Sequence, residues 1–300
     1  MKKFIKKFVI YTSIVAGVLS FSIGATYFIV SSASFNLPRD KNILILGDSH
    51  TERAINDRIL TKSVNLAESA TAYLYSYVKL RKLIKNNPQI DTLLLSFHSS
   101  VFLNNQDYRR TILDNRIVRF VPKYITLFAA EEFAFFRNRK DFYWSILKLP
   151  LKNVRTIAKF IIRRRVSYKD LYIGGFKNSN SNNIPNEDSA EDQENVKHKE
   201  INTELQISQY LMKIIDLCEE NGITLVLINT PTYMPEKYGN PELARYYYHR
   251  YLENRGVHYL DYSDFPLPDF GYSDIGHLNP KGAEIFTRYL NDNYNEDVLN

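Results

Sequence analysis

The fold is decided at Asn42-Ile43-Leu44-Ile45-Leu46-Gly47-Asp48-Ser49-His50-Thr51-Glu52, where an apolar run stops at a glycine. A short β-branched and leucine-rich run predicts a buried strand, and the residues after the glycine predict the start of a helix. Ligands of open α/β sheets bind at the carboxyl ends of the strands, which is where Ser49 lies. This serine is therefore either a nucleophile beside helix amides that can receive an oxyanion, or a plain N-cap of the helix.

The same alternation of short apolar runs and longer amphipathic stretches continues along the chain. Strands are predicted at Asn42–Leu46, Thr92–Phe97, Thr224–Asn229 and Val257–Tyr262, and helices at Thr51–Leu60, Ala70–Lys85, Asn202–Glu220, Pro241–Arg255 and Pro280–Asn293. This alternation is typical of βα units stacked on one parallel sheet. The sequence therefore predicts a doubly wound α/β domain.

A long uncharged stretch occupies the beginning of the chain. Phe8–Val30 holds 23 residues without a charge, follows Lys2, Lys3, Lys6 and Lys7, and exceeds the roughly 20 residues that span a bilayer. We predict one transmembrane anchor at residues 1–33, with the N-terminus in the cytoplasm and residues 34–300 extracytoplasmic. The alternatives are a signal peptide cleaved near Ser32-Ala33-Ser34 and a buried core helix.

The net charge of +6 comes mostly from those four lysines. Without them, 35 basic residues face 33 acidic ones, which argues against nucleic-acid binding by the folded domain. The single cysteine, Cys218, excludes an intramolecular disulfide and a multi-cysteine zinc site.

Two segments interrupt the α/β pattern. Residues 107–170 carry 16 Lys/Arg against 6 Asp/Glu among many aromatics, so we predict a basic insertion of amphipathic helices at about 107–176. Its charges form either a solvated face, or a groove for an acidic polymer or a contact with anionic lipid headgroups. The polar stretch at about 177–200 predicts a mobile, disordered loop.

A second polar stretch precedes the last predicted helix and reads Ser273-Asp274-Ile275-Gly276-His277-Leu278-Asn279-Pro280-Lys281-Gly282. Asn279 as N-cap and Pro280 at the first helical position place His277 in the entry loop of that helix. In a tight loop Asp274 can accept the Nδ1–H of His277 and leave Nε2 facing a serine hydroxyl, as in nucleophilic hydrolases.

These two blocks resemble the first and last blocks of the SGNH/GDSL hydrolase superfamily: Gly47-Asp48-Ser49-His50, and Asp274-x-x-His277 with the following Leu-Asn-Pro. The resemblance covers residues 42–105 and 202–295. It implies a flavodoxin-like three-layer SGNH fold in which Ser49 is the catalytic nucleophile, His277 the base and Asp274 the acid that orients it.

The middle blocks depart from the family pattern. The second block, Val64–Ala70, lacks the glycine whose amide usually serves the oxyanion hole, so the amide of Glu68 or Ser69 is the predicted substitute. The third block lacks the usual Gly-x-Asn-Asp, and its side-chain donor is predicted among His98, Ser99 and Asn104. Pro231 and Thr232 follow a predicted strand at the same sheet edge and are predicted to line the substrate pocket.

A metal site is the competing chemical interpretation. Asp48, His50, His98, Asp274 and His277 include enough histidines and carboxylates for a zinc site, but their spacing matches no helical zinc motif. We predict no metal and no cofactor. His50 is predicted to be a surface residue at the helix start.

The first block also resembles the SGNH domains of polysaccharide O-acetyltransferases. That resemblance implies an extracytoplasmic serine esterase or O-acyl(acetyl)transferase that acts on a cell-envelope glycan or acylated carbohydrate, with partner proteins of a polysaccharide-modification system. The alternative is a catalytically degenerate SGNH-fold scaffold or glycan-binding protein.

Overall fold

The computed structural model of the chain describes residues 1–99, 111, 115–178, 208–235 and 240–299, with side chains described as far as residue 293. The predicted loop at about 177–200 therefore lies almost wholly outside the described residues, and so does Asn104. The chain divides into two compact units. We call residues 1–36 and 112–173 the helical unit, and residues 37–111 and 174–300 the sheet unit.

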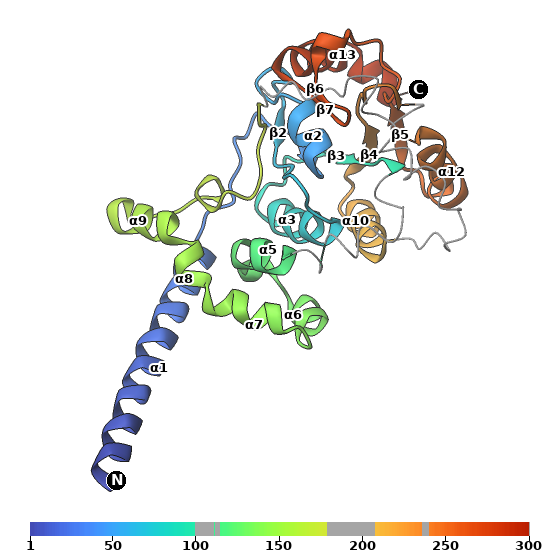
Figure 1. Ribbon diagram of the computed structural model, residues 1–300. Helices are drawn as coiled ribbons and strands as arrows, with labels where there is room; N and C mark the ends of the chain where they lie inside the picture. Colours follow the sequence, from blue (N-terminus) through green and yellow to red (C-terminus); the bar gives the residue numbers. More distant parts are fainter. Residues whose placement is uncertain (100–110, 112–114, 179–207, 236–239, 300) are drawn as a thin grey trace. The chain divides into compact units, whose positions relative to one another are not determined.

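The sheet unit is built on five parallel strands, β1 (Ile43–Leu46), β2 (Ser63–Asn65), β3 (Thr92–Ser96), β4 (Thr224–Asn229) and β5 (His258–Asp261). Their order is β2-β1-β3-β4-β5, one of the two common orders of doubly wound sheets. The predicted α/β class with a parallel sheet is thus confirmed (Figure 1). β2 is not among the predicted strands, because three residues are too few to show a hydrophobic period.

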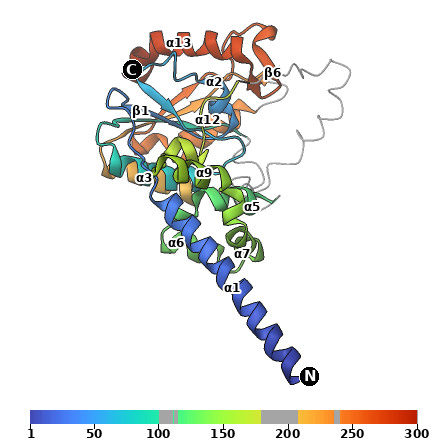
Figure 2. The same cartoon turned by 90° about the vertical axis from the view of Figure 1, so that its left-hand side faces the viewer.

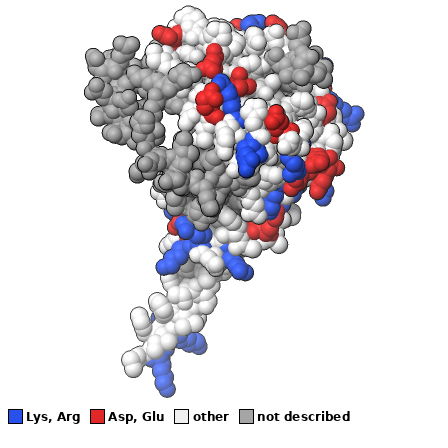
Figure 3. Space-filling view, turned by 90° about the vertical axis from the view of Figure 1, so that its right-hand side faces the viewer, with Lys and Arg blue, Asp and Glu red and all other residues white. Residues whose placement is uncertain are grey.

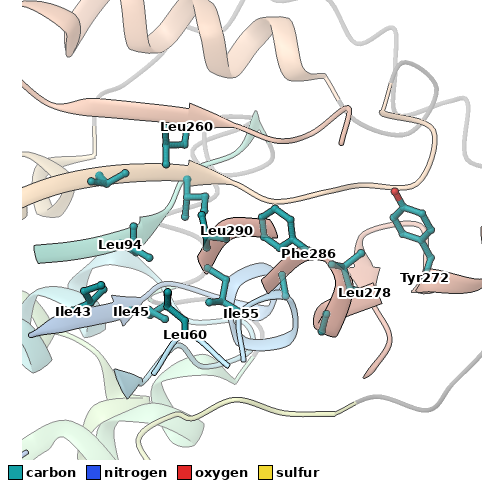
Figure 4. Packing of buried hydrophobic residues seen from close by; sticks show 14 residues of the cluster. Ile43, Ile45, Ile55, Leu60, Leu94, Leu260, Tyr272, Leu278, Phe286 and Leu290 are labelled. Carbon is teal, nitrogen blue, oxygen red and sulfur yellow. The ribbon is translucent and has the colours of Figure 1, made fainter. Parts of the chain in front are cut away.

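Helices cover both faces of this sheet, as expected for parallel strands that are apolar on both sides. The helices are α2 (Ser49–Ala54), α3 (Tyr73–Asn86), α10 (Gln209–Glu220), α12 (Pro241–Tyr251) and α13 (Pro280–Leu299). Figures 1 and 2 show α2 and α13 on one face and α3 and α10 on the other. Under α13, Phe286 and Leu290 are fully buried and point toward Ile45, Leu94 and Leu260 of the strands (Figure 4).

The turn between β1 and α2 admits only glycine. Gly47 has φ +131°, and a Cβ built there would lie 2.3 Å from the Cβ of Ser96 on β3. Such a φ is strongly disfavoured for residues with a side chain, and the contact is far inside van der Waals distance. Because the turn at Gly47 packs closely against Ser96 of β3, its backbone conformation is fixed, and so is the position of Ser49, the first residue of α2.

The helical unit contains α1 (Lys2–Ser31) and the helices of the predicted insertion, which are α5 (Arg116–Tyr124), α6 (Ala130–Phe136), α7 (Lys140–Leu147), α8 (Leu149–Lys152) and α9 (Val154–Arg163), with 3₁₀ turns η3 (Ile125–Leu127) and η4 (Tyr168–Leu171). α1 is long and apolar enough to cross a membrane. It forms a rod with an uncharged surface that ends in lysines (Figure 3). Because residues 1–21 are all exposed, α1 is not a buried core helix.

We predict that Gly47→Ala destabilises the sheet unit by about 2 kcal/mol or more, because the new Cβ needs both a disfavoured φ and a shift of β3. Gly222→Ala is the matched control: Gly222 has φ +65° and nothing within 4 Å of its virtual Cβ, so only about 1 kcal/mol is expected. Urea unfolding of the full chain in detergent measures both. Equal losses would contradict the steric argument.

Candidate active site

Ser49 is the first residue of α2 and does not cap it. The cap is Asp48, whose carboxylate accepts the backbone N–H of His50 at 3.1 Å. The interpretation of Ser49 as a plain N-cap is therefore wrong. The Ser49 hydroxyl instead lies 2.7 Å from Nε2 of His277, to which it can donate.

His277 comes from a small antiparallel pair, β6 (Tyr272–Asp274) and β7 (His277–Leu278), that leads into α13. Its Nδ1–H donates to Asp274 Oδ1 at 2.7 Å. The predicted helix start is present, since Asn279 Oδ1 accepts the N–H groups of Lys281 and Gly282 at 3.0 and 3.1 Å. The entry loop is thereby held in place, and it presents the imidazole to Ser49.

Three further donors contact the Asp274 carboxylate. Gly276 N–H donates to Oδ1 at 3.0 Å, and Arg53 Nη1 and the Ser273 hydroxyl each donate to Oδ2 at 3.4 Å. Burial raises the pKa of the Asp274 carboxyl group, but the His277 and Gly276 hydrogen bonds and the Arg53 charge outweigh it, so its pKa lies below the usual value. Arg53 is not among the site residues predicted from the sequence, although its position four residues after Ser49 places both on one side of α2.

A second carboxylate and histidine cluster lies beside the first. Asp48 Oδ1 accepts His50 Nδ1–H at 3.0 Å and the Ser96 hydroxyl at 3.1 Å, and Oδ2 accepts His98 Nε2–H at 3.0 Å. Burial raises the pKa of Asp48, yet the charges and hydrogen bonds of His98 and His50 outweigh it and hold the pKa well below its usual range. Asp48 is therefore an ionised carboxylate in the interior.

The prediction that His50 is a surface residue is wrong. Its side chain is only 17% exposed, and its ring centroid lies 3.9 Å from that of His98 and 5.2 Å from that of His277. The imidazole is drawn inward because Asp48, two residues earlier, accepts its Nδ1–H. His50 thus connects the Asp48 cluster to the Ser49, His277 and Asp274 group.

Asp48, His50 and His98 are the described residues that could hold a metal ion. Their ligand atoms lie within 4.8 Å of one another. The Nδ1 of His50 and the Nε2 of His98, each 3.0 Å from a carboxylate oxygen of Asp48, already make hydrogen bonds with it. A metal ion would have to replace these hydrogen bonds. Asp274 and His277, which the metal interpretation also included, are not part of this group.

The oxyanion donors predicted for the second block are the amides of Glu68 and Ser69. The Glu68 N–H donates to the Gly47 carbonyl at 3.0 Å, so its assignment to the oxyanion hole is wrong. The Ser69 hydroxyl is hydrogen-bonded to the Glu52 carboxylate. The next residue, Ala70, has φ +67°, a left-handed conformation that normally favours glycine. The backbone geometry of a glycine turn is therefore present although the glycine is not.

A pocket adjoins the cluster of Asp48, His50 and His98, and its described lining residues do not include Ser49, Asp274 or His277. Its lining includes the predicted residues His98, Ser99 and Thr232, together with His50, Ile275 and Gly276. Further polar side chains in the lining are Asn229, Asn240 and Ser263. Pro231 is buried and is not among the described lining residues, so the prediction that it lines the pocket is not supported.

A protein-family model that carries no descriptive name matches residues 187–299, which is less than half of the chain. The matched segment includes Asp274 and His277 but not Ser49. No curated protein matches the chain.

We predict that Asp48→Asn lowers the thermal unfolding midpoint at neutral pH, and that the difference from the wild type shrinks in acid. Folding lowers the pKa of Asp48, so its stabilising contribution is complete above the unfolded-state pKa of about 3.9 and is lost as pH falls through the lower folded-state pKa. Melting curves between neutral pH and about pH 3 measure the effect. The exposed Asp292→Asn is the control. A pH-independent difference would contradict the assignment.

Proposed function

We propose that this chain is a membrane-anchored SGNH-type serine esterase or O-acyltransferase that acts on a cell-envelope carbohydrate. The observation that carries the proposal is the chain of hydrogen bonds from Ser49 through His277 to Asp274, with both distances at 2.7 Å. The strand order β2-β1-β3-β4-β5 agrees with the flavodoxin-like sheet that the SGNH resemblance implies.

In the proposed reaction, the Ser49 oxygen attacks the ester carbonyl while its proton passes to His277 Nε2. Asp274, held by Gly276 and Arg53, keeps Nδ1 protonated and stabilises the imidazolium. Collapse of the tetrahedral intermediate breaks the ester bond, and His277 returns the proton to the leaving sugar hydroxyl. Water then releases the acyl group as an acid, or another sugar hydroxyl accepts it.

The side-chain oxyanion donor in this proposal comes from the altered third block. It is His98, which follows Ser96, the last residue of β3, by two positions. Since Nε2–H of His98 donates to Asp48, Nδ1 can donate to an oxyanion only when the ring is protonated. We infer that His98 takes the place of the usual asparagine.

The substrate class rests on the pocket and on the resemblance. Hydroxyl and amide side chains of Ser99, Thr232, Asn229 and Asn240 line the pocket and suit a ligand rich in hydroxyl groups. The first block resembles SGNH domains that acetylate polysaccharides, so acetyl is the proposed acyl group. α1, which carries four lysines near its N-terminal end, is the proposed anchor, with the sheet unit on the extracytoplasmic side.

We predict that Ser49→Ala abolishes hydrolysis of a chromogenic acetyl ester and labelling by a fluorophosphonate, with a loss of at least about 1000-fold in kcat/KM. Asp274→Asn should cost about two to four orders of magnitude in kcat. Ser31→Ala, at an exposed position of α1, is the control and should label normally. Labelling that persists in the Ser49→Ala variant, or is absent from the folded wild type, would favour the glycan-binding scaffold.

We predict that His98→Ala lowers kcat by about 100- to 1000-fold, the cost of one lost oxyanion donor. His98→Asn should retain more activity than His98→Ala, because an amide side chain can both contact Asp48 and donate. Melting curves recorded alongside separate catalysis from folding. Equal kcat values for the wild type and His98→Ala would exclude His98 as a donor.

A further inference from the structure

The depth of α1 in a membrane is limited by its own neighbours in the helical unit. Residues 1–21 are exposed all round, whereas from residue 22 onward one side of the helix is covered, with Thr26 and Val30 buried. Among the described elements, α7, α8, α9 and η3 pack against α1. The uncovered part of the uncharged run is therefore only residues 8–21.

This uncovered part is too short to span a bilayer. Fourteen helical residues rise about 21 Å, while the hydrocarbon core is about 30 Å thick. If α1 spans the membrane, its covered end must also lie within the bilayer. The helices that cover it then share that depth and must present a surface that lipid can accept.

Such a surface is present on α7, α8 and α9. These three helices carry large apolar side chains that are exposed, namely Tyr143, Trp144, Leu147, Leu151, Val154, Ile161 and Ile162. Leu151 and Ile162 are 75% and 79% exposed. Contact of such large apolar side chains with water is unfavourable, and contact with lipid would remove this cost. Trp and Tyr are the residues enriched at the boundary between lipid and water. We call this set the lipid-facing surface.

The charges of the same segment are almost all positive. Residues 140–165 contain eight Lys or Arg and one acidic residue, Asp141. Arg163, Arg164 and Arg165 are exposed and directly precede Val166, whose carbonyl accepts Ser34 N–H at 3.0 Å. Ser34 follows the end of α1 by three residues. If α1 spans the membrane, the three arginines lie at the level where it leaves the bilayer, which is the level of the lipid phosphates.

We propose that α7, α8 and α9 are embedded in the outer leaflet around the end of α1, with the lipid-facing surface against acyl chains and Arg163–Arg165 on anionic headgroups. This inference rests on the proposed anchoring by α1, and it assigns the basic insertion to lipid rather than to an acidic polymer. If so, the helical unit is partly embedded in the membrane, and α1 is not connected to it by a flexible linker.

Trp144 is the only tryptophan of the chain, so its fluorescence reports on α7 alone. The full chain is reconstituted into phosphatidylcholine vesicles with and without phosphatidylglycerol. We expect lipids brominated near the headgroup to quench Trp144 and aqueous iodide to quench it weakly, most weakly with phosphatidylglycerol. The double variant Leu151→Asp, Ile162→Asp should move α7 out of the lipid, expose Trp144 to water and raise its iodide quenching constant severalfold. Tyr246→Asp, an exposed aromatic on α12, is the control and should leave it unchanged.

Carbonate extraction of the same vesicles distinguishes a failure of the proposed anchoring by α1 from a failure of the proposed lipid-facing surface. If the protein resists extraction but iodide quenches Trp144 as strongly in the wild type as in the double variant, α1 is inserted and the lipid-facing surface is refuted. If Trp144 is shielded from both iodide and brominated lipid, a protein covers it and the proposal fails. If carbonate extracts the protein, anchoring by α1 fails and the inference fails with it, whereas the Ser49 chemistry is unaffected.

Discussion

A buried carboxylate at the end of the first strand holds the site together. Asp48 is 4% exposed and ionised, a state that is costly in a protein interior unless hydrogen bonds replace the lost water. Its two oxygens accept from the α2 backbone, from Ser96 on β3 and from His50 and His98. These bonds join β1, α2 and β3 at the carboxyl edge of the sheet. Because Asp48 caps α2, the hydroxyl of Ser49 is left for His277.

The site thus contains two carboxylates, Asp274 and Asp48, and each of them orients histidine side chains. The two carboxylates differ in burial and in the histidines they bind, and we propose different roles for them. Asp274 is partly exposed, holds His277 through Nδ1 and leaves Nε2 for Ser49. Asp48 is buried and holds His50 and His98 on the side of the pocket. Proton transfer is proposed for the first pair, and binding of the carbonyl oxygen for His98. The ring of His50 lies 3.9 Å from that of His98 and 5.2 Å from that of His277, in tilted arrangements, and these contacts are the physical link between the two groups.

The helical unit has its own constraint, which is the length of apolar helix left uncovered. Packing of α7, α8 and α9 on the end of α1 leaves 14 uncharged residues, about 21 Å, outside the contact. The exposed Leu151 and Ile162 and the basic run Arg163–Arg165 lie on those covering helices. The proposed position of these helices in the outer leaflet would give the exposed apolar side chains and the excess of positive charge in this segment a single physical explanation.

The sequence by itself determined the strands β1, β3, β4 and β5, the apolar α1, and Ser49, Asp274 and His277 as candidates, because burial and local caps leave periodic and short-range signals. It also determined the cap at Asn279. Only the tertiary structure decided that Asp48 rather than Ser49 caps α2 and that the His50 side chain points inward. It also decided that the Glu68 N–H donates to the Gly47 carbonyl and that Arg53 donates to Asp274. It also grouped α1 with an insertion some eighty residues later in the chain. Each of these depends on contacts between segments distant in sequence, and such contacts have no periodicity to read.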